Sequence, residues 1–289
     1  MLWMGITVVP YTLAILLVRL FGASSRTRYR IARAWLKLSV DSAGVIMGIR
    51  TRITGMEHLP TQENQGVVLL VKHQSTYETF LMPAIMPRPL AYVFKKELLR
   101  VPFFGWSIGS LDMIHIDRGQ GVRAFVKVVQ QGRALLARGT WVIMFPEGTR
   151  VERGQVGQYK SGGTRLAIDS GVPVVPVAVT SARVWPRKAF IKRPGVVDVS
   201  IGQPIPSVGR KPDELMREVE DWIEAEMRRL DPEAYPTKPW ARHDAAAGAT
   251  GARPVRPARA AGARCRCFAL GGGLADRENQ ARTACSPYR

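Results

Sequence analysis

The feature that most constrains the fold of this chain is a short stretch, residues 72–78, which follows an apolar, β-branched run over residues 66–71. The run predicts a buried strand, and residues 77–86 predict the opening of a helix. His73 therefore lies where a buried strand passes into a helix. Open α/β sheets carry their reactive groups at such carboxyl ends of strands. This position makes His73 a candidate catalytic residue.

A carboxylate, Glu78, follows His73 by five residues. If the chain turns sharply between them, Glu78 can hold one imidazole nitrogen, and the other nitrogen is then free to accept a proton from a hydroxyl. The segment from Ser75 to Glu78 also fits a capping box, in which the glutamate side chain accepts a hydrogen bond from backbone at a helix start. This stretch alone leaves both roles of Glu78 open.

The body of the chain alternates strand and helix patterns from about residue 51 to residue 230. Such alternation predicts an α/β fold with a mostly parallel sheet flanked by helices. Further strands are expected over residues 90–94, 113–117, 141–145, 174–179 and 196–201, and further helices over residues 122–137 and 213–230.

Charged residues stand at the ends of three of these strands, namely Lys95, Arg118 and the sequence Phe-Pro-Glu-Gly-Thr-Arg over residues 145–150. In the last of these, glycine lets backbone approach a ligand, and Arg150 can grip a phosphate with two hydrogen bonds. A second cation, Lys95 or Arg118, would complete an anion site. The alternative is that each stretch is an ordinary turn with solvated charge, but their shared place at strand ends favours a common site.

The first 50 residues have a different character and are predicted to be membrane-associated helical segments. Residues 1–21 are almost wholly apolar, four arginines lie between residues 26 and 33, and residues 31–49 form a second helix-like segment. Such a basic cluster is expected on the cytoplasmic side, near anionic headgroups. A hairpin in one leaflet and a spanning helix both fit this pattern, and a packed helix pair in a soluble protein is the alternative.

The net charge of the 289-residue chain is +19, from 42 basic and 23 acidic residues, which indicates an anionic partner. Nucleic acid is not expected, because the body has no basic stripe interleaved with aromatic residues. Residues 237–289 are rich in alanine, glycine, arginine and proline and predict a disordered basic tail. Residues 51–236 are thus left as the α/β domain. The three cysteines all lie in the tail and no metal-ligand cluster is visible, so no metal is expected.

In order along the chain, His73 with Glu78 and the segments 95–105, 145–150 and 172–176 resemble the four motifs of the glycerolipid acyltransferases, in particular the bacterial 1-acyl-sn-glycerol-3-phosphate acyltransferases. The resemblance covers about residues 31–230. It implies transfer of an acyl group from acyl-CoA or acyl-carrier protein onto the hydroxyl of a lysophospholipid, with the acyl donor as co-substrate and no cofactor. Lysophosphatidic acid is the expected acceptor, and another lysolipid such as lyso-ornithine lipid is the alternative.

The resemblance also implies a role for each site residue and a place in the cell. His73 would be the general base and Glu78 the carboxylate that orients it. The catalytic domain would lie on the cytoplasmic face of the inner membrane, in contact with membrane lipids. The substrate-binding residues would be Lys95, Arg118 and Arg150, which hold phosphate, and Glu147, Gly148 and Thr149, which shape the pocket.

Two residues depart from the family pattern. The family usually has aspartate where this chain has Glu78, and often asparagine where it has Lys72. Glutamate keeps the charge and adds one methylene, so the contact with the imidazole requires a shift of about a bond length. Activity is expected to survive, while the acceptor is less closely defined.

Overall fold

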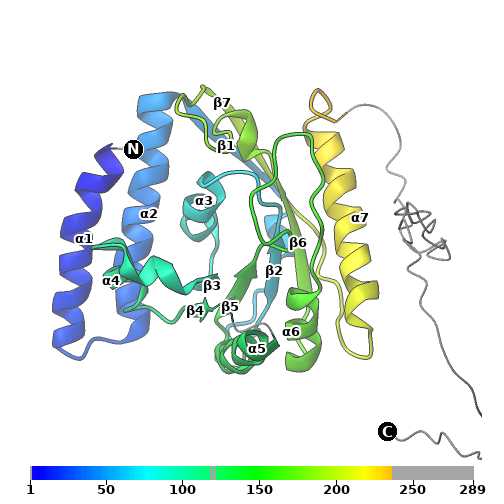
Figure 1. The fold of residues 1–289 in the computed structure, drawn as a ribbon, viewed down its shortest axis with the longest axis horizontal. Helices are drawn as coiled ribbons and strands as arrows, with labels where there is room; N and C mark the ends of the chain where they lie inside the picture. The colour runs from blue at the N-terminus through cyan, green and yellow to red at the C-terminus, as the bar shows by residue number, and fades with distance from the viewer. Residues whose placement is uncertain (1, 118, 120–121, 236–289) are drawn as a thin grey trace, which may run out of the picture. The chain divides into compact units, whose positions relative to one another are not determined.

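Seven strands of the described chain form one central sheet in the order β1-β7-β6-β2-β5-β3-β4 (Figure 1). Neighbouring strands are parallel except for β6 and β7, which are antiparallel, so the predicted α/β fold with a mostly parallel sheet is confirmed. The computed structural model describes residues 2–117, 119 and 122–235, and the predictions for Arg118 and for residues 237–289 lie outside them. The strands are Ile49–Thr54 (β1), Val68–Val71 (β2), Leu90–Lys95 (β3), Ile114–Ile116 (β4), Trp141–Met144 (β5), Val174–Val179 (β6) and Gly195–Ile201 (β7).

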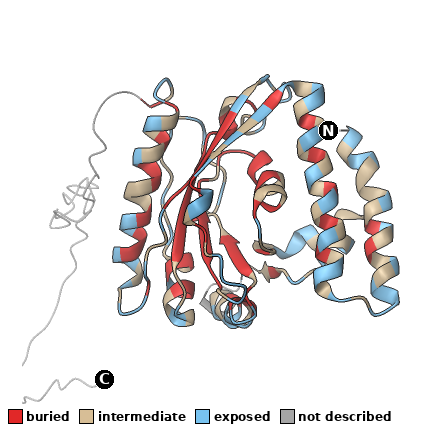
Figure 2. Ribbon diagram, turned by 180° about the vertical axis from the view of Figure 1, so that it is seen from behind, coloured by how far each residue is buried: buried red, intermediate tan, exposed pale blue. Residues whose placement is uncertain are grey.

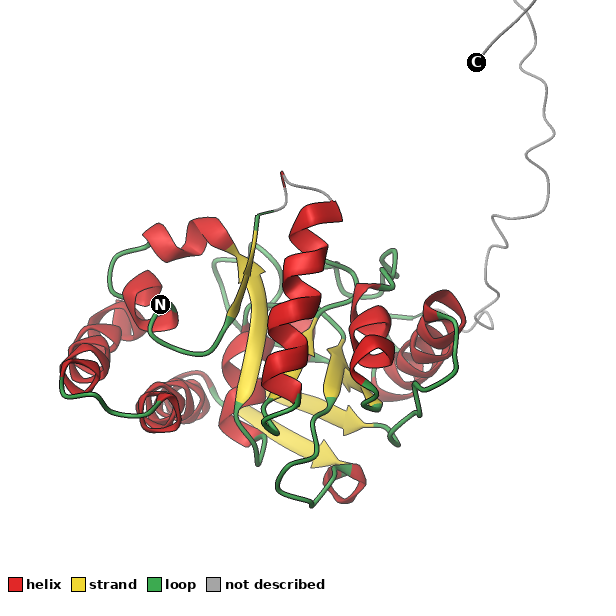
Figure 3. Ribbon diagram, turned by 90° about the horizontal axis from the view of Figure 1, so that it is seen from below, coloured by secondary structure: helices red, strands yellow, loops and turns green. Residues whose placement is uncertain are grey.

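Helices cover both faces of the sheet, as Figure 3 shows from below. Helices α2 and α3 pack on one face, and α5, α6 and α7 pack on the other. The helices are Leu2–Leu20 (α1), Ser25–Met47 (α2), Tyr77–Ile85 (α3), Phe104–Ile108 (α4), Val122–Leu136 (α5), Gly162–Ser170 (α6) and Pro212–Leu230 (α7), with short 3-10 turns at Met56–His58 (η1), Lys96–Arg100 (η2) and Ser181–Arg183 (η4).

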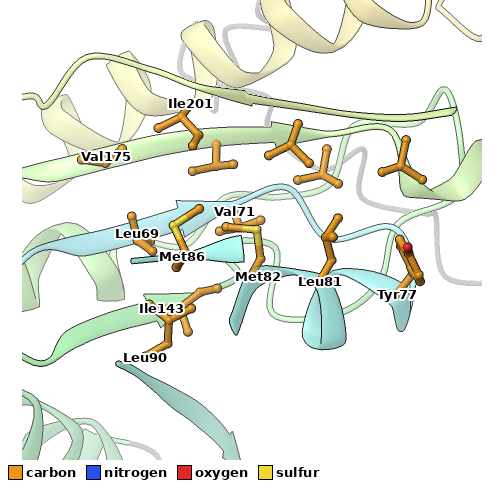
Figure 4. Packing of buried hydrophobic residues seen from close by; sticks show 14 of the residues in the cluster. Leu69, Val71, Tyr77, Leu81, Met82, Met86, Leu90, Ile143, Val175 and Ile201 are labelled. Atoms are coloured by element: carbon orange, nitrogen blue, oxygen red, sulfur yellow. The ribbon is translucent and has the colours of Figure 1, made fainter. Parts of the chain in front are cut away.

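Strand β2 lies in the middle of the sheet and is buried on both faces. Successive side chains of a strand point to opposite faces. Leu69 and Val71 accordingly belong to the core shared with α3, whereas Val68 and Leu70 belong to the core shared with α5, α6 and α7. Figure 4 shows the first core, and Figure 2 shows the buried strands with helices on both sides of them. Burying a valine or leucine is worth about 1.5–3 kcal/mol, so these runs fix the strand centrally.

The first two helices form a pair on one side of the sheet (Figure 1). Helix α2 packs against α3, and Tyr29 ties it to β3 by accepting a hydrogen bond from the N–H of Leu90 (2.9 Å). Helix α1 packs on α2 and keeps an exposed apolar flank that includes Leu13, Leu17 and Leu20. Within the described chain, residues 3–20 are long and apolar enough to cross a membrane, with a mean hydropathy of 1.7.

The second helix ends earlier than the sequence predicts. The expected helix over residues 31–49 begins at Ser25, capped by the side chain of Ser24, and ends at Met47. Gly48 adopts a left-handed conformation (φ 66°), which stops the helix, and Ile49 already begins β1. Strand β1 and the short helices α4 and α6 were not predicted.

Candidate active site

The Phe-Pro-Glu-Gly-Thr-Arg segment holds His73 at the carboxyl end of β2. The N–H of His73 donates to Glu147 Oε2 (3.1 Å), and its carbonyl accepts from the N–H of Val151 (2.8 Å). The imidazole ring stacks on Phe145, with ring centroids 3.9 Å apart and planes 17° apart. Backbone and ring are therefore both fixed by one segment, residues 145–151.

The imidazole of His73 is neutral near pH 7. Burial, together with the nearby charge of Arg150, lowers the pKa of His73 to about 3. Its Nδ1 atom is buried and has no hydrogen-bond partner among the described residues. A neutral imidazole is the form that can accept a proton. The site thus presents a base whose protonation by solvent is suppressed.

Glu78 lies in the first turn of α3, and its carboxylate accepts hydrogen bonds from the backbone that precedes the helix. Oε1 accepts hydrogen bonds from the N–H groups of Gln74 (2.7 Å) and Ser75 (2.8 Å) and from the hydroxyl of Ser181 (2.7 Å). The hydroxyl oxygen of Ser75 in turn accepts from the N–H of Tyr77 (3.0 Å). Glu78 thus makes the carboxylate-to-backbone half of a capping box, and no hydrogen bond joins it to the imidazole of His73 within the described residues. Glu78 fixes the turn that displays the histidine.

A buried charge network stands behind the histidine. The ammonium of Lys72 lies 3.1 Å from Glu147 Oε1 and 2.5 Å from Glu224 Oε1, and all three side chains are fully buried. Tyr159 donates a further hydrogen bond to Glu224 Oε1 (2.9 Å). Since the other oxygen of Glu147 accepts from the backbone N–H of His73, this carboxylate links the ammonium of Lys72 to the histidine backbone.

Burial and neighbouring charges shift the pKa values of three residues near the histidine. Burial alone would lower the pKa of Lys72, but the charges of Glu147 and Glu224 outweigh it and raise that pKa. Burial raises the pKa of Glu147 to about 7, against the opposing effect of Lys72. Burial likewise raises the pKa of Glu78 to about 7, although Ser181 and backbone N–H groups stabilise its ionised form. The carboxyl groups of Glu78 and Glu147 therefore titrate near neutral pH.

Two cavities meet at His73. The apolar cavity has a volume of 430 Å³ and lies between the α1–α2 pair, α3 and α4. Phe80 and Phe104 contribute to its wall, and Arg150 lies in it with a guanidinium nitrogen 2.6 Å from the hydroxyl of Thr76. An apolar chamber with one cation suits a molecule that has a hydrocarbon chain and an anionic group.

The second cavity has a volume of 980 Å³ and opens on the side of α5, α6 and α7. Most of its exposed lining is apolar, but it holds six charged side chains, and we call it the polar cavity for them. His73 lines both cavities, as do Tyr92 and Phe94. The charged residues of the polar cavity are the cations Lys95, Lys160, Arg165 and Arg217 and the acids Asp213 and Glu220. A reacting group that enters from either side would meet the same imidazole.

The predicted substrate-binding residues do not form one cluster. Arg150 lines the apolar cavity, whereas Lys95 lines the polar one and forms an exposed ion pair with Glu97 (2.9 Å). Gly148 lines the polar cavity with φ 67°, beside the Lys160 ammonium. Glu147 and Thr149 line neither cavity, and Arg118 lies outside the described residues.

Three residues of the site were not singled out from the sequence. Thr76 positions Arg150, Ser181 supports Glu78, and Glu224 pairs with Lys72. Ser181 follows β6 closely, so the same strand-end signal could have found it. Glu224 interrupts the apolar face of α7, where a carboxylate requires a buried partner.

The fold is also that of a known crystal structure, the 1-acyl-sn-glycerophosphate acyltransferase PlsC from Thermotoga maritima. The match has a TM-score of 0.59 at 24% identity and covers 81% of this chain and 100% of that one. At this identity the likeness shows the fold alone.

Sequence comparisons identify the family. The family model described as "Acyltransferase" matches residues 50–180. The 1-acyl-sn-glycerol-3-phosphate acyltransferase of Pseudomonas aeruginosa is 39% identical over 211 residues, which cover 72% of this chain and 80% of that protein. The human 1-acyl-sn-glycerol-3-phosphate acyltransferase alpha is 29% identical over 62% of this chain and 63% of its own length. The chain therefore belongs to the acyltransferase family that includes the Pseudomonas protein.

Proposed function

We propose that this protein transfers a fatty acyl group from a thioester donor, acyl-CoA or acyl-carrier protein, to the hydroxyl of 1-acyl-sn-glycerol-3-phosphate, which gives phosphatidic acid. The names of its relatives support the reaction. The observation that carries the proposal is a neutral His73 that borders two cavities at once, one apolar with Arg150 and one larger with six charged side chains.

The two cavities fit the two substrates. In the proposal, the lysophospholipid lies in the apolar cavity with its phosphate near Arg150, because an arginine binds phosphate through two parallel hydrogen bonds. The thioester donor approaches His73 through the polar cavity. Such an arrangement places hydroxyl and thioester on the same imidazole, which converts their encounter into a positioned reaction.

The reaction proceeds by direct attack. His73 accepts the proton of the lipid hydroxyl while the hydroxyl oxygen bonds to the thioester carbonyl carbon. The carbon–sulfur bond then breaks, the acyl group stays on the lipid oxygen, and the thiolate takes the proton from the imidazolium. His73 returns to its neutral form, and no covalent acyl-enzyme is required.

Substrate binding would also make His73 a stronger base. Part of the lowering of its pKa comes from the charge of Arg150. A phosphate bound to Arg150 would neutralise this charge, and the pKa of His73 would rise toward its ordinary value. The acceptor would thus activate the base that deprotonates it.

We further propose that the protein acts at a membrane, with its catalytic side toward the cytoplasmic leaflet. The apolar flank of α1 and the basic start of α2 support insertion of this helix pair. Helix α2 lines the apolar cavity, so a lipid in the membrane beside α2 would have a short route through this cavity to His73.

The test is an assay of the purified full-length protein in mixed micelles. Lysophosphatidic acid is compared with lyso-ornithine lipid and other lysolipids, each with acyl-CoA and with acyl-carrier protein as donor. We expect lysophosphatidic acid to be the best acceptor and His73→Ala to lower kcat by about 10²–10⁴-fold. Wild-type turnover in a folded His73→Ala variant would refute the mechanism, and a preference for a lysolipid without phosphate would refute the acceptor.

A further inference from the structure

A loop far along the chain from α1 carries a second exposed apolar surface. Residues 186–194 are part of the connection between η4 and β7, and the side chains of Phe190 and Ile191 are 97% and 73% exposed. Leaving a phenylalanine fully in water forgoes the stabilisation that its burial would give. Contiguous exposed apolar side chains rimmed by polar residues mark interaction surfaces.

The loop is held in place by the body of the protein. The ammonium of Lys192 donates to the carbonyl oxygens of Ala189 (2.5 Å) and Phe190 (3.0 Å) and lies 5.1 Å from the ring centroid of Trp185. Trp185 is itself part of the buried core, and the N–H of Arg193 donates to Val184 (2.9 Å). Hydrogen bonds to the loop backbone, from the Lys192 side chain and from Arg193 N–H, therefore hold the loop with its two apolar side chains exposed.

The loop lies beside the end of α2. The N–H of Gly195 donates to the carbonyl of Gly48 (3.2 Å), and Pro194 lies against Gly48. Just before Gly48, Val45 and Ile46 are 88% and 69% exposed. We call Val45, Ile46, Phe190 and Ile191 the end patch.

The end patch lies near the start of the apolar helix α1. Trp3, at the start of α1, donates a hydrogen bond to Ser42 of α2 (3.0 Å), one turn before the end patch. Figure 1 shows the start of α1, the end of α2 and the start of β7 at the same end of the molecule. The start of α1 and the end patch therefore lie at the same end of the molecule.

The charges of the loop indicate what the end patch contacts. Residues 186–194 contain four cations and no acid, and Lys188 and Arg193 are exposed. An apolar tip with a basic rim fits the boundary between acyl chains and anionic headgroups. A protein partner would need a matching acidic apolar surface, whereas the bilayer proposed to hold α1 offers both features beside it.

We propose that the end patch, with Lys188 and Arg193 around it, docks onto the surface of a bilayer that contains anionic lipid. It is a second membrane contact, made by the α/β body and separate from the insertion of α1. The inference rests on the proposed membrane association. Two contacts on different elements would fix the rotation of the body about α1, and with it the direction in which the apolar cavity faces.

The test uses the full-length protein in vesicles with an environment-sensitive fluorophore on a single cysteine. Cys265, Cys267 and Cys285 are first replaced by serine. The label is then placed by Phe190→Cys, by Leu17→Cys on the exposed flank of α1, and by Val208→Cys, a control 74% exposed in another loop. Vesicles of neutral lipid are compared with vesicles that contain phosphatidylglycerol, and nitroxide lipids serve as quenchers.

We expect the label at residue 190 to shift to shorter wavelength and to be quenched by nitroxide lipid, most strongly with phosphatidylglycerol, while the label at residue 208 stays aqueous. Charge reversal by Lys188→Glu and Arg193→Glu should remove the dependence on phosphatidylglycerol. If the label at residue 190 stays in water while the label at residue 17 is buried in lipid, the inference about the end patch is wrong and the proposed membrane association stands.

Aqueous labels at both residues 17 and 190 would overturn the proposed membrane association as well. A label at residue 190 that is already shielded in micelles, with a dimer seen by light scattering, would assign the end patch to a protein contact and overturn the inference.

Discussion

Replacing Lys72 by methionine should lower the free energy of unfolding strongly, because it removes one partner of a buried charge network. Methionine is of similar length but carries no charge. Its introduction leaves Glu147 and Glu224 buried without the ammonium that lies 3.1 and 2.5 Å from them. Breaking a buried ion pair by removing one partner costs about 3–5 kcal/mol. For a domain of this size, that loss lowers Tm by roughly 6–20 °C.

The loss should depend on pH. The pKa of Glu147 is already about 7 with Lys72 present, and removal of the ammonium raises it further. Below about pH 6 Glu147 of Lys72→Met can escape the penalty by protonation, so the difference from wild type should shrink. At pH 8 it should be largest. Packing loss alone would give the same difference at both pH values.

A double-mutant cycle isolates the interaction. Glu224→Gln removes the second carboxylate, and the double variant Lys72→Met/Glu224→Gln should lose less stability than the two single variants added together, by about 1–3 kcal/mol. Lys37→Met is the matched control, because Lys37 pairs with Asp41 on an exposed helix face (2.8 Å) and such pairs are worth about 0–1 kcal/mol.

Thermal unfolding in detergent, followed by circular dichroism at pH 8 and pH 5.5, gives the stabilities, and kcat is measured on the same samples. Because Glu147 also holds the backbone of His73, kcat of Lys72→Met should fall more than KM rises. A Lys72→Met variant that loses less than about 1 kcal/mol at pH 8, with no pH dependence, would show that the network does not stabilise the fold.

Three further outcomes are expected. Glu78→Gln should lower the free energy of unfolding by about 1–3 kcal/mol and lower kcat less than His73→Ala does, since its carboxylate bonds to backbone; unchanged unfolding in urea would contradict this role. Arg150→Lys keeps the charge but removes the guanidinium that can donate two parallel hydrogen bonds to a phosphate, so KM for the acceptor should rise about tenfold while KM for the donor changes less. An effect on the donor alone would place Arg150 at the donor phosphates. Because the pKa of Glu147 is raised from 4.5 to about 7 on folding, the native state binds more protons than the unfolded state between these values, so stability should fall as pH rises from about 4.5 to 7. Urea unfolding across this range should show a smaller slope for Glu147→Gln, and equal slopes would refute the assignment.

The sequence predicted the central strands well because each is a short apolar run that is buried on both faces. It missed β1 because Ile-Arg-Thr-Arg-Ile-Thr joins directly to a helical pattern and lies at the edge of the sheet. It missed α6, which begins with two glycines. In both cases the packing of neighbouring elements decides the local structure.

The proximity of some candidate site residues could be predicted from the sequence, although their roles stay predictions. His73 and its supporting segment 145–150 follow from strand ends, since parallel strands bring their carboxyl ends together. The separation of Lys95 from Arg150 could not be predicted, because it depends on which helices stand on each side of the sheet. The pairing of Lys72 with Glu224 joins residues 152 positions apart, and a single sequence carries no signal for such a contact.

The junction at Gly48 has a mechanical consequence. A single residue separates the end of α2 from the start of β1, and its left-handed turn is closed by hydrogen bonds to Ala43 and Gly44. So short a junction leaves no linker on which the helix pair could swivel. A thicker or thinner bilayer would therefore tilt the helix pair and the α/β body together, without bending the chain at Gly48. The apolar cavity between the helix pair, α3 and α4 would keep its width, and only the angle at which it meets the lipid would change.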